Sequence, residues 1–339
     1  MSAARGERGI VLVVVLVFVL LLTGAIATFL RRATVDAMIA RHRDEAAEAE
    51  SLARGGVRLG VALLLEDRLR EEADGFRSET LLDVWARAEA VEIPAPEGES
   101  LRLRIEDAGA RLDLNALLDE DGAPRKNADL YLVELLEKVI DDMPGRPEQK
   151  RYEPEELARN LLDYIDEDEV AQNGGGEADA YAKRTPPAAP ANRPLLSVAE
   201  LRLVEGFDGP LVDALSHYVT VFPYAKADGI NPNTAPPHVL GILYHGVGTE
   251  MGLADEDTVR RVLKAREGGE VLCADEAKNP ACSPLSAVVE GEIFPPPTYK
   301  TDVFTLVAEA SVGEVRRSAR AVVDRSKPDQ PLLLSWQVE

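Results

Sequence analysis

An unbroken apolar run near the N-terminus constrains this chain more than any other feature of its sequence. Residues 10–30 (IVLVVVLVFVLLLTGAIATFL) carry no charged side chain over 21 positions. As an α-helix the run spans about 31 Å, the thickness of a bilayer's hydrocarbon core. Arginines flank it on both sides, which gives little information on orientation: Arg5, Arg8, Arg31 and Arg32. The run predicts a single transmembrane helix over residues 10–32.

The junction before this helix indicates how the N-terminus is processed. A secretory signal peptide is the nearest alternative, but the run is too long and lacks a small-x-small cleavage site before the double arginine. A short basic leader, residues 1–9, ends in Gly9 directly before Ile10. This order resembles a type IV prepilin signal, in which a dedicated peptidase cuts after the glycine and leaves the helix attached. Most such signals carry Glu at the fifth mature position, where this chain has Val14.

The helix is expected to continue beyond the membrane to about residue 72. Apolar side chains recur with a period near 3.6 residues between Val35 and Val61, and charged residues lie between them. Gly55 and Gly56 interrupt this pattern, which indicates a bend or a close packing contact.

Strand patterns occur at two distant places in the chain. Residues 100–115 alternate apolar and polar side chains around a turn, which is typical of a hairpin. Comparable patterns return only at 303–312, 316–326 and 332–336. We expect these strands to form one antiparallel sheet packed on the N-terminal helix, which is an α+β fold.

The pattern of the long region between the strands predicts helices separated by proline-rich breaks. We therefore expect an inserted all-helical domain over residues 116–298, with the pilin-like helix and first strands at 33–115 and the last strands at 299–339. Two of its segments, 195–218 and 230–243, resemble helix-hairpin-helix (SAM-like) units. Such units often bind DNA, but a net charge of −22 and the lack of Lys or Arg in residues 230–241 argue against nucleic acid.

Acidic side chains crowd a glycine-rich loop inside the insertion. Seven carboxylates lie between residues 163 and 179, and they repel one another unless water or a cation compensates. A hard cation with oxygen ligands suits alternating side chains of this kind: Asp163, Asp166, Asp168, Glu177 and Asp179. The spacing is not that of an EF-hand. A solvated acidic loop without an ion is the alternative, and the residues of a second candidate site follow further on: Asp255, Glu256, Asp257 or Asp275.

The chain has two cysteines, Cys273 and Cys282, which lie nine residues apart. In an oxidising compartment a disulfide between them closes easily and stabilises by about 2–3 kcal/mol. Two free thiols are the alternative. A disulfide would place this region outside the cytoplasm.

No catalytic constellation is visible in the sequence. The four histidines do not form an H-E-x-x-H motif, there is no G-x-S-x-G motif, and the glycines after Gly246 do not fit a dinucleotide fingerprint. We therefore expect that the chain is not an enzyme.

The order of these features resembles the minor pseudopilin K family of bacterial type II secretion systems. Ile230-Asn231-Pro232-Asn233-Thr234-Ala235 is the most specific match. The other matching segments, in chain order, are Gly9-Ile10 with Val14, Asp83-Val84-Trp85-Ala86, Asp107 with Leu112-Asp113-Leu114-Asn115, Leu162-Asp163-Tyr164-Ile165-Asp166, Glu177-Ala178-Asp179 before Tyr181, Asn192-Arg193-Pro194-Leu195 and Val198-Ala199-Glu200-Leu201.

The resemblance implies a subunit at the tip of a periplasmic pseudopilus, anchored in the inner membrane by one helix, with the bulk of the chain in the periplasm. Its implied partners are minor pseudopilins I and J, the prepilin peptidase, and the secretin or secreted proteins. It also implies N-methylation at Ile10 after cleavage, and calcium in the insertion. The Glu missing at Val14 is tolerated at a tip, because no subunit lies above to pair with it. A membrane-anchored DNA-uptake protein is the alternative, and an anchored periplasmic enzyme comes third.

Overall fold

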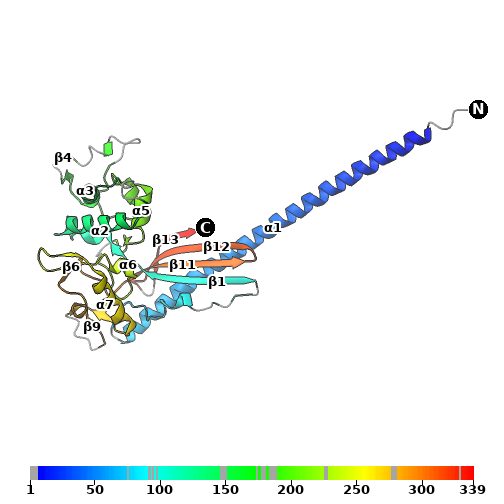
Figure 1. Cartoon of the computed structure of the whole chain (residues 1–339). Helices are drawn as coiled ribbons and strands as arrows, with labels where there is room; N and C mark the ends of the chain where they lie inside the picture. The colour runs from blue at the N-terminus through cyan, green and yellow to red at the C-terminus, as the bar shows by residue number, and fades with distance from the viewer. Residues whose placement is uncertain are drawn as a thin grey trace, which may run out of the picture.

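The computed structural model describes residues 7–74, 76–90, 93, 95–96, 98–145, 151–172, 175–176, 181–182, 189–224, 228–275, 281–327 and 330–339. Helix α1 (Glu7–Asp74) dominates it and extends as a long rod from the rest of the protein (Figure 1). The apolar run therefore continues without interruption into the predicted extramembrane helix. The apolar side chains of residues 10–30 are exposed, whereas those from Ala49 onward begin to be buried. One helix thus has an uncovered apolar half and a half that packs on its own domain.

Four strands form the antiparallel sheet that covers the second half of α1. They are β1 (Glu99–Asp107), β11 (Val303–Val312), β12 (Val315–Asp324) and β13 (Leu332–Val338), in the order β1-β11-β12-β13. In β1 the apolar side chains face α1 in strict alternation. Buried side chains from α1 and the inner face of the sheet make one core, with Trp85 at an edge-to-face contact with Phe304. The predicted α+β fold and the joining of early and late strands are confirmed.

The predicted hairpin at residues 100–115 is wrong. β1 pairs over its whole length with β11, from Glu99 opposite Val312 to Asp107 opposite Phe304. After β1 the chain turns through the 3₁₀-helix η2 (Ala108–Ala110), and β2 (Leu112–Asp113) then pairs in parallel with β5 (Val219–Thr220). The alternation of residues 112–114 therefore belongs to the insertion, because the turn at η2 redirects the chain away from the sheet.

The insertion leaves the sheet after β1, returns at β11 and has its own large apolar core. Its helices include α2 (Ala128–Asp142), α3 (Pro154–Ile165), α5 (Gly209–Leu215), α6 (Pro237–Leu240) and α7 (Glu256–Glu267). Its 3₁₀ segments include η3 (Leu114–Leu117), η5 (Val198–Leu203) and η7 (Leu285–Ala287); η1 (Ala88–Ala90) lies before the sheet. The core of the insertion already includes Leu112 and Leu114, and the division at residues 115 and 298 stays a prediction.

The expectation that the insertion is all-helical is too simple. Short strands join its helices: β3 (Val170–Ala171), β4 (Gly175–Gly176), β6 (Tyr244–Gly246), β7 (Gly252–Leu253), β8 (Leu272–Cys273), β9 (Ser283–Pro284) and β10 (Glu292–Phe294). The second helix-hairpin-helix-like segment contains only the four-residue helix α6, after which the chain extends into β6. Its apolar residues nevertheless pack in the core, as an interior packing module requires: Val239, Leu240, Ile242 and Leu243.

Candidate functional site

The processing site predicted from sequence lies on the first turns of α1. Gly9 and Ile10 both lie within this helix, and the side chains of Ile10 and Val14 are 67% and 57% exposed. Residues 10–30 form the apolar part of the one described helix that is long and apolar enough to cross a membrane. Because a bilayer would cover this surface, the helix fits a single-pass anchor with a large remainder beyond it.

Two glycines let α1 lie directly on the sheet. A Cβ at Gly56 would stand 2.8 Å from the Cβ of Ala308, and one at Gly60 would overlap the side chain of Leu306. Gly55, by contrast, faces open space. The sequence pattern indicated either a bend or a close packing contact at Gly55 and Gly56, and the structure shows close packing at Gly56. Gly60 makes a tighter contact that the sequence pattern did not single out.

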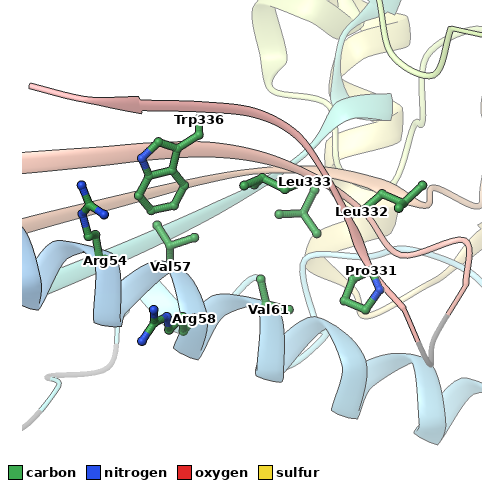
Figure 2. Close-up of a pocket in the computed structure, with 9 residues that line it drawn as sticks. Arg54, Val57, Arg58, Val61, Pro331, Leu332, Leu333 and Trp336 are labelled. Atoms are coloured by element: carbon green, nitrogen blue, oxygen red, sulfur yellow. The ribbon is translucent and has the colours of Figure 1, made fainter.

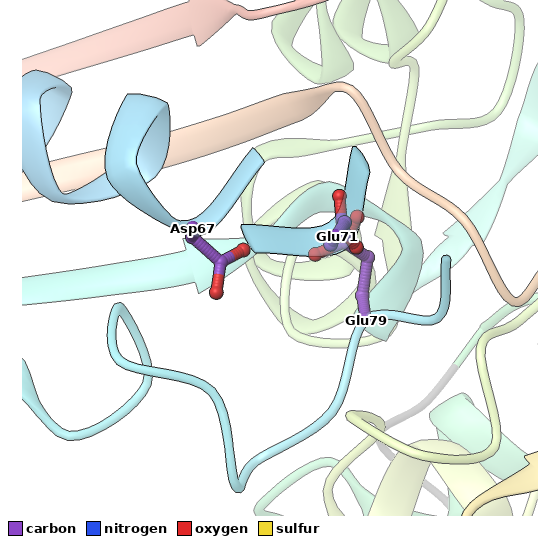
Figure 3. Close-up of side chains that lie close together, drawn as sticks. All are labelled: Asp67, Glu71 and Glu79. Atoms are coloured by element: carbon purple, nitrogen blue, oxygen red, sulfur yellow. The ribbon is translucent and has the colours of Figure 1, made fainter. Parts of the chain in front are cut away.

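The C-terminal end of α1 carries a buried cluster of charges (Figure 3). Carboxylate oxygens of Asp67, Glu71 and Glu79 lie within 4.8 Å of one another, and in the described part of the chain this is the one acidic group spaced to hold a metal. The guanidinium of Arg325 lies among them, 2.9 Å from Asp67 Oδ2 and 2.7 Å from Glu79 Oε1. It also stacks over Phe304, with 4.6 Å to the ring centroid.

Electrostatics support an ion-pair network at this cluster rather than a metal centre. Burial raises the pKa of Glu79 well above its usual value, and the charge of Arg325 opposes that shift. Burial alone would lower the pKa of Arg325, but the three carboxylates outweigh it and raise that pKa. Arg77 adds a second cation, which pairs with Asp302 and lies 3.6 Å from Glu71. Arginine already supplies the positive charge that three buried carboxylates need.

The Asn-Pro-Asn-Thr-Ala segment lies next to this cluster and joins the insertion to the sheet. The side-chain amide of Asn231 donates to Asp107 Oδ2 at 3.0 Å and to the carbonyl of Glu79 at 3.2 Å. Thr234 donates its hydroxyl to the same Asp107 oxygen at 2.6 Å. Burial raises the pKa of Asp107, and these hydrogen bonds favour its charged form. The motif therefore fixes the end of β1.

A second asparagine of the motif anchors the distal part of the insertion. Asn233 donates to the carbonyl of Leu272 at 2.8 Å and accepts from the amide of Leu272 at 2.8 Å. This pair of bonds holds β8 and, with it, the disulfide between Cys273 and Cys282, whose S–S distance is 2.04 Å. Asn115 of the Leu-Asp-Leu-Asn segment forms an equivalent pair of hydrogen bonds. Its side-chain amide donates to the carbonyl of Leu195 at 3.1 Å, and its side-chain oxygen accepts from the backbone amide of Leu195 at 2.8 Å.

The structure describes three of the five proposed calcium ligands, and Glu177 and Asp179 lie outside the described residues. Asp163 and Asp166 are buried and Asp168 is exposed, all three at or just beyond the end of α3. The carboxylate of Asp163 accepts from the amide of Gln172 at 3.2 Å. Burial raises the pKa of Asp163, and the nearby charge of Asp168 raises it further. The three carboxylates are of the type that a hard cation binds, but they do not form a group spaced to hold a metal within the described residues.

An apolar groove separates α1 from β13 (Figure 2). Its volume is about 410 Å³. Its lining residues, which define the α1–β13 groove, are Arg54, Val57, Arg58, Val61, Val323, Pro331, Leu332, Leu333 and Trp336. Sequence reasoning did not find this groove, since it forms only where the last strand approaches the helix.

A long helix with an apolar, uncovered first half and a second half lying on an antiparallel sheet defines a membrane-anchored, pilin-like subunit. A family model described as type II secretion system (T2SS), protein K, matches residues 110–224. Type II secretion system protein K of Aeromonas hydrophila is 30% identical over 257 residues, covering 74% of this chain and 73% of the relative. The protein of that name from Pseudomonas aeruginosa is 25% identical and covers 95% and 90%. The chain belongs to the type II secretion system protein K family.

A solved structure has the same fold. It is titled as the GspK-GspI-GspJ complex from the type 2 secretion system of enterotoxigenic Escherichia coli, and the matching chain superposes with a TM-score of 0.61 at 22% identity. The match covers 88% of this chain and 99% of the other. These matches give no support to the alternative of a DNA-uptake protein.

Proposed function

We propose that this chain is a minor pseudopilin at the tip of a type II secretion pseudopilus, where it nucleates assembly with the I-type and J-type minor pseudopilins. The single observation that carries this proposal is α1, which runs without a break from an exposed apolar segment onto the sheet. Such a helix can anchor the subunit in the inner membrane and later pack in a filament. The role is structural, in support of the export of folded proteins across the outer membrane.

Both ends of the molecule support the proposed position at the tip. Val14 supplies no carboxylate to pair with the terminal amine of a neighbour, so the first turns need no subunit above them. At the other end, the insertion lies at the end of the sheet, beside the last turns of α1 (Figure 1). Its bulk would block growth of the filament past this subunit, and it would face the secretin and the secreted proteins in the periplasm.

Co-purification tests the proposed assembly. The full chain, tagged and extracted in detergent, is expected to retain the I-type and J-type subunits of the same secretion system. A full chain that folds but retains neither subunit would contradict the proposal. Salt-sensitive DNA binding by the full chain would instead favour the uptake alternative.

We also propose that the prepilin peptidase cuts between Gly9 and Ile10 and that the new terminus is methylated. The basic leader directly before the apolar helix supports this proposal. N-terminal sequencing and mass measurement of the mature protein are expected to show a start at N-methylated Ile10. A mature start beyond Arg32 would exclude the pilin-like anchor.

Calcium is proposed as the ion of the acidic loop after α3. Asp163, Asp166 and Asp168 would provide oxygen ligands, with Glu177 and Asp179 completing the set. Calcium is expected to raise the melting temperature of the unmutated chain, and the double variant Asp166→Ala/Asp168→Ala should lose this rise. Asp257→Ala, at the alternative acidic site, serves as the control and should keep it. Equal melting with calcium and with chelator in the unmutated chain would eliminate the site.

A further inference from the structure

We propose that the α1–β13 groove binds a helix of a neighbouring pilin-like subunit, one that carries an apolar ridge and a carboxylate. This inference rests on the proposed function and deepens it, because it assigns the face of the subunit that the partner contacts. Figure 2 shows Val57 and Val61 of α1 opposite Leu333 and Trp336 of β13, with an open space between the two elements.

The spacing of the groove's α1 wall fits a helix. Arg54, Val57, Arg58 and Val61 follow one another at intervals of three, one and three residues, so they form one stripe along two turns of α1. The stripe is about 10 Å long at 1.5 Å per residue. A second helix lying along α1 would place two of its own turns against this stripe, with its ridge between the side chains of α1 and β13.

The other wall of the groove is not covered by any residue that the structure describes. Leu332 and Leu333 are 44% and 57% exposed, although both are large and apolar. β13 pairs with β12 on one side and is the last strand of the sheet, so its outer edge has no partner strand among the described residues. An exposed apolar edge strand invites association, and proteins usually cover or blunt such an edge. A small ligand would not suffice, because it would leave these leucines and the strand edge in water.

Charge at the rim specifies the chemistry of the partner. Arg54 is held by Glu50 at 2.5 Å and lies 5.8 Å from the centroid of the Trp336 ring. Arg58 is exposed beside the groove, and it makes no ion pair with any residue that the structure describes. A carboxylate on the incoming helix would pair with Arg58 and set the register of the two helices. A second copy of this chain is disfavoured, because each copy carries a net charge of −22.

Two substitutions, one on the apolar wall and one at the rim, test the groove without disturbing the core. Leu333→Glu places a charge on the apolar wall, and Arg58→Glu reverses the charge at the rim. Leu203→Glu is the matched control, since Leu203 is 54% exposed on the insertion and outside the groove. Circular dichroism establishes that each full-length variant is folded. Affinity for the I-type and J-type subunits is expected to fall about tenfold or more for the groove variants and to stay unchanged for the control.

Trp336 provides an independent readout of the same site. The chain has two tryptophans, and Trp85 is buried at 2% exposure, so Trp336 is the one open to a quencher. Binding of the partner should reduce acrylamide quenching of Trp336 fluorescence. Bound partner with unchanged quenching, or with unchanged affinity for Leu333→Glu, would overturn the groove as its site.

The outcomes separate this inference from the proposed function. If the unmutated chain binds neither subunit, the proposed function fails. If it binds them and the groove variants bind equally well, the groove inference alone fails. If Leu333→Glu instead abolishes self-association of the full chain, measured by light scattering, the groove belongs to a second copy and the inference is likewise overturned.

Discussion

The side-chain amide of Asn231 donates to the carboxylate of Asp107 at 3.0 Å and so joins segments that are 124 residues apart. Asp107 is the last residue of β1, and Asn231 lies deep in the insertion. This bond, together with the one from Asn231 to Glu79, ties the orientation of the insertion to the end of the sheet.

Asn231→Ala is therefore expected to lower the free energy of unfolding by about 2–3 kcal/mol, because it leaves the buried carbonyl of Glu79 without its side-chain donor and removes one of the two side-chain donors to Asp107 Oδ2. Urea titration followed by circular dichroism measures the loss. Asn160→Ala is the control, since Asn160 makes a single bond to Glu205 at the surface. A similar loss in both variants would show that Asn231 has no special role.

Arg325→Met is expected to cost about 3–5 kcal/mol of unfolding free energy. The substitution removes the cation that pairs with all three carboxylates of Asp67, Glu71 and Glu79, and Arg77, 3.6 Å from Glu71, can replace it only in part. Arg320→Met, at an exposed position of β12 five residues earlier in the chain, should change stability little. Stability close to that of the unmutated chain for Arg325→Met would mean that the carboxylates are protonated and need no partner.

Gly60→Ala and Gly55→Ala should have opposite effects on stability. A methyl group at Gly60 collides with Leu306 and pushes α1 away from the sheet, which costs about 1–3 kcal/mol. At Gly55 the methyl group meets nothing within 4 Å, and the helix gains up to about 1 kcal/mol from the better propensity of alanine. Thermal melting of the two variants side by side checks the contrast, and equal shifts would exclude close packing at Gly60.

The raised pKa of Asp83 predicts that stability depends on pH between about pH 4 and pH 6. Burial raises the pKa of its carboxyl to about 6, the charges of Asp67 and Glu71 raise it too, and hydrogen bonds from Thr80 oppose the shift. Because the folded state holds this proton more tightly than the unfolded state, the unfolding free energy falls as pH rises through this window. Asp83→Asn should reduce that fall, as measured by melting at pH 4, 5, 6 and 7. An unchanged pH profile, matching that of the surface variant Asp257→Asn, would contradict the assignment.

The sequence predicted those parts of the molecule whose causes are local. The apolar run of residues 10–30 predicts a membrane-length helix, and the alternation of residues 303–312 predicts a strand; both signals depend on neighbours a few positions away. The order of short motifs was also enough to identify the family. The proposed calcium ligands remain a prediction of this kind, since they are adjacent in sequence and two of them lie outside the described residues.

Only the tertiary structure decided which distant segments meet. The alternation around residue 103 predicts a strand but does not specify its partner, and β1 pairs with a strand some 200 positions later instead of with residues 112–114. Arg325, Gly60 and the α1–β13 groove carry no local signal, because their roles arise from the close approach of α1 to late strands. Periodicity and composition fix what each segment can become, whereas long-range packing fixes which charge is buried, which glycine is needed and which apolar face stays open for a partner.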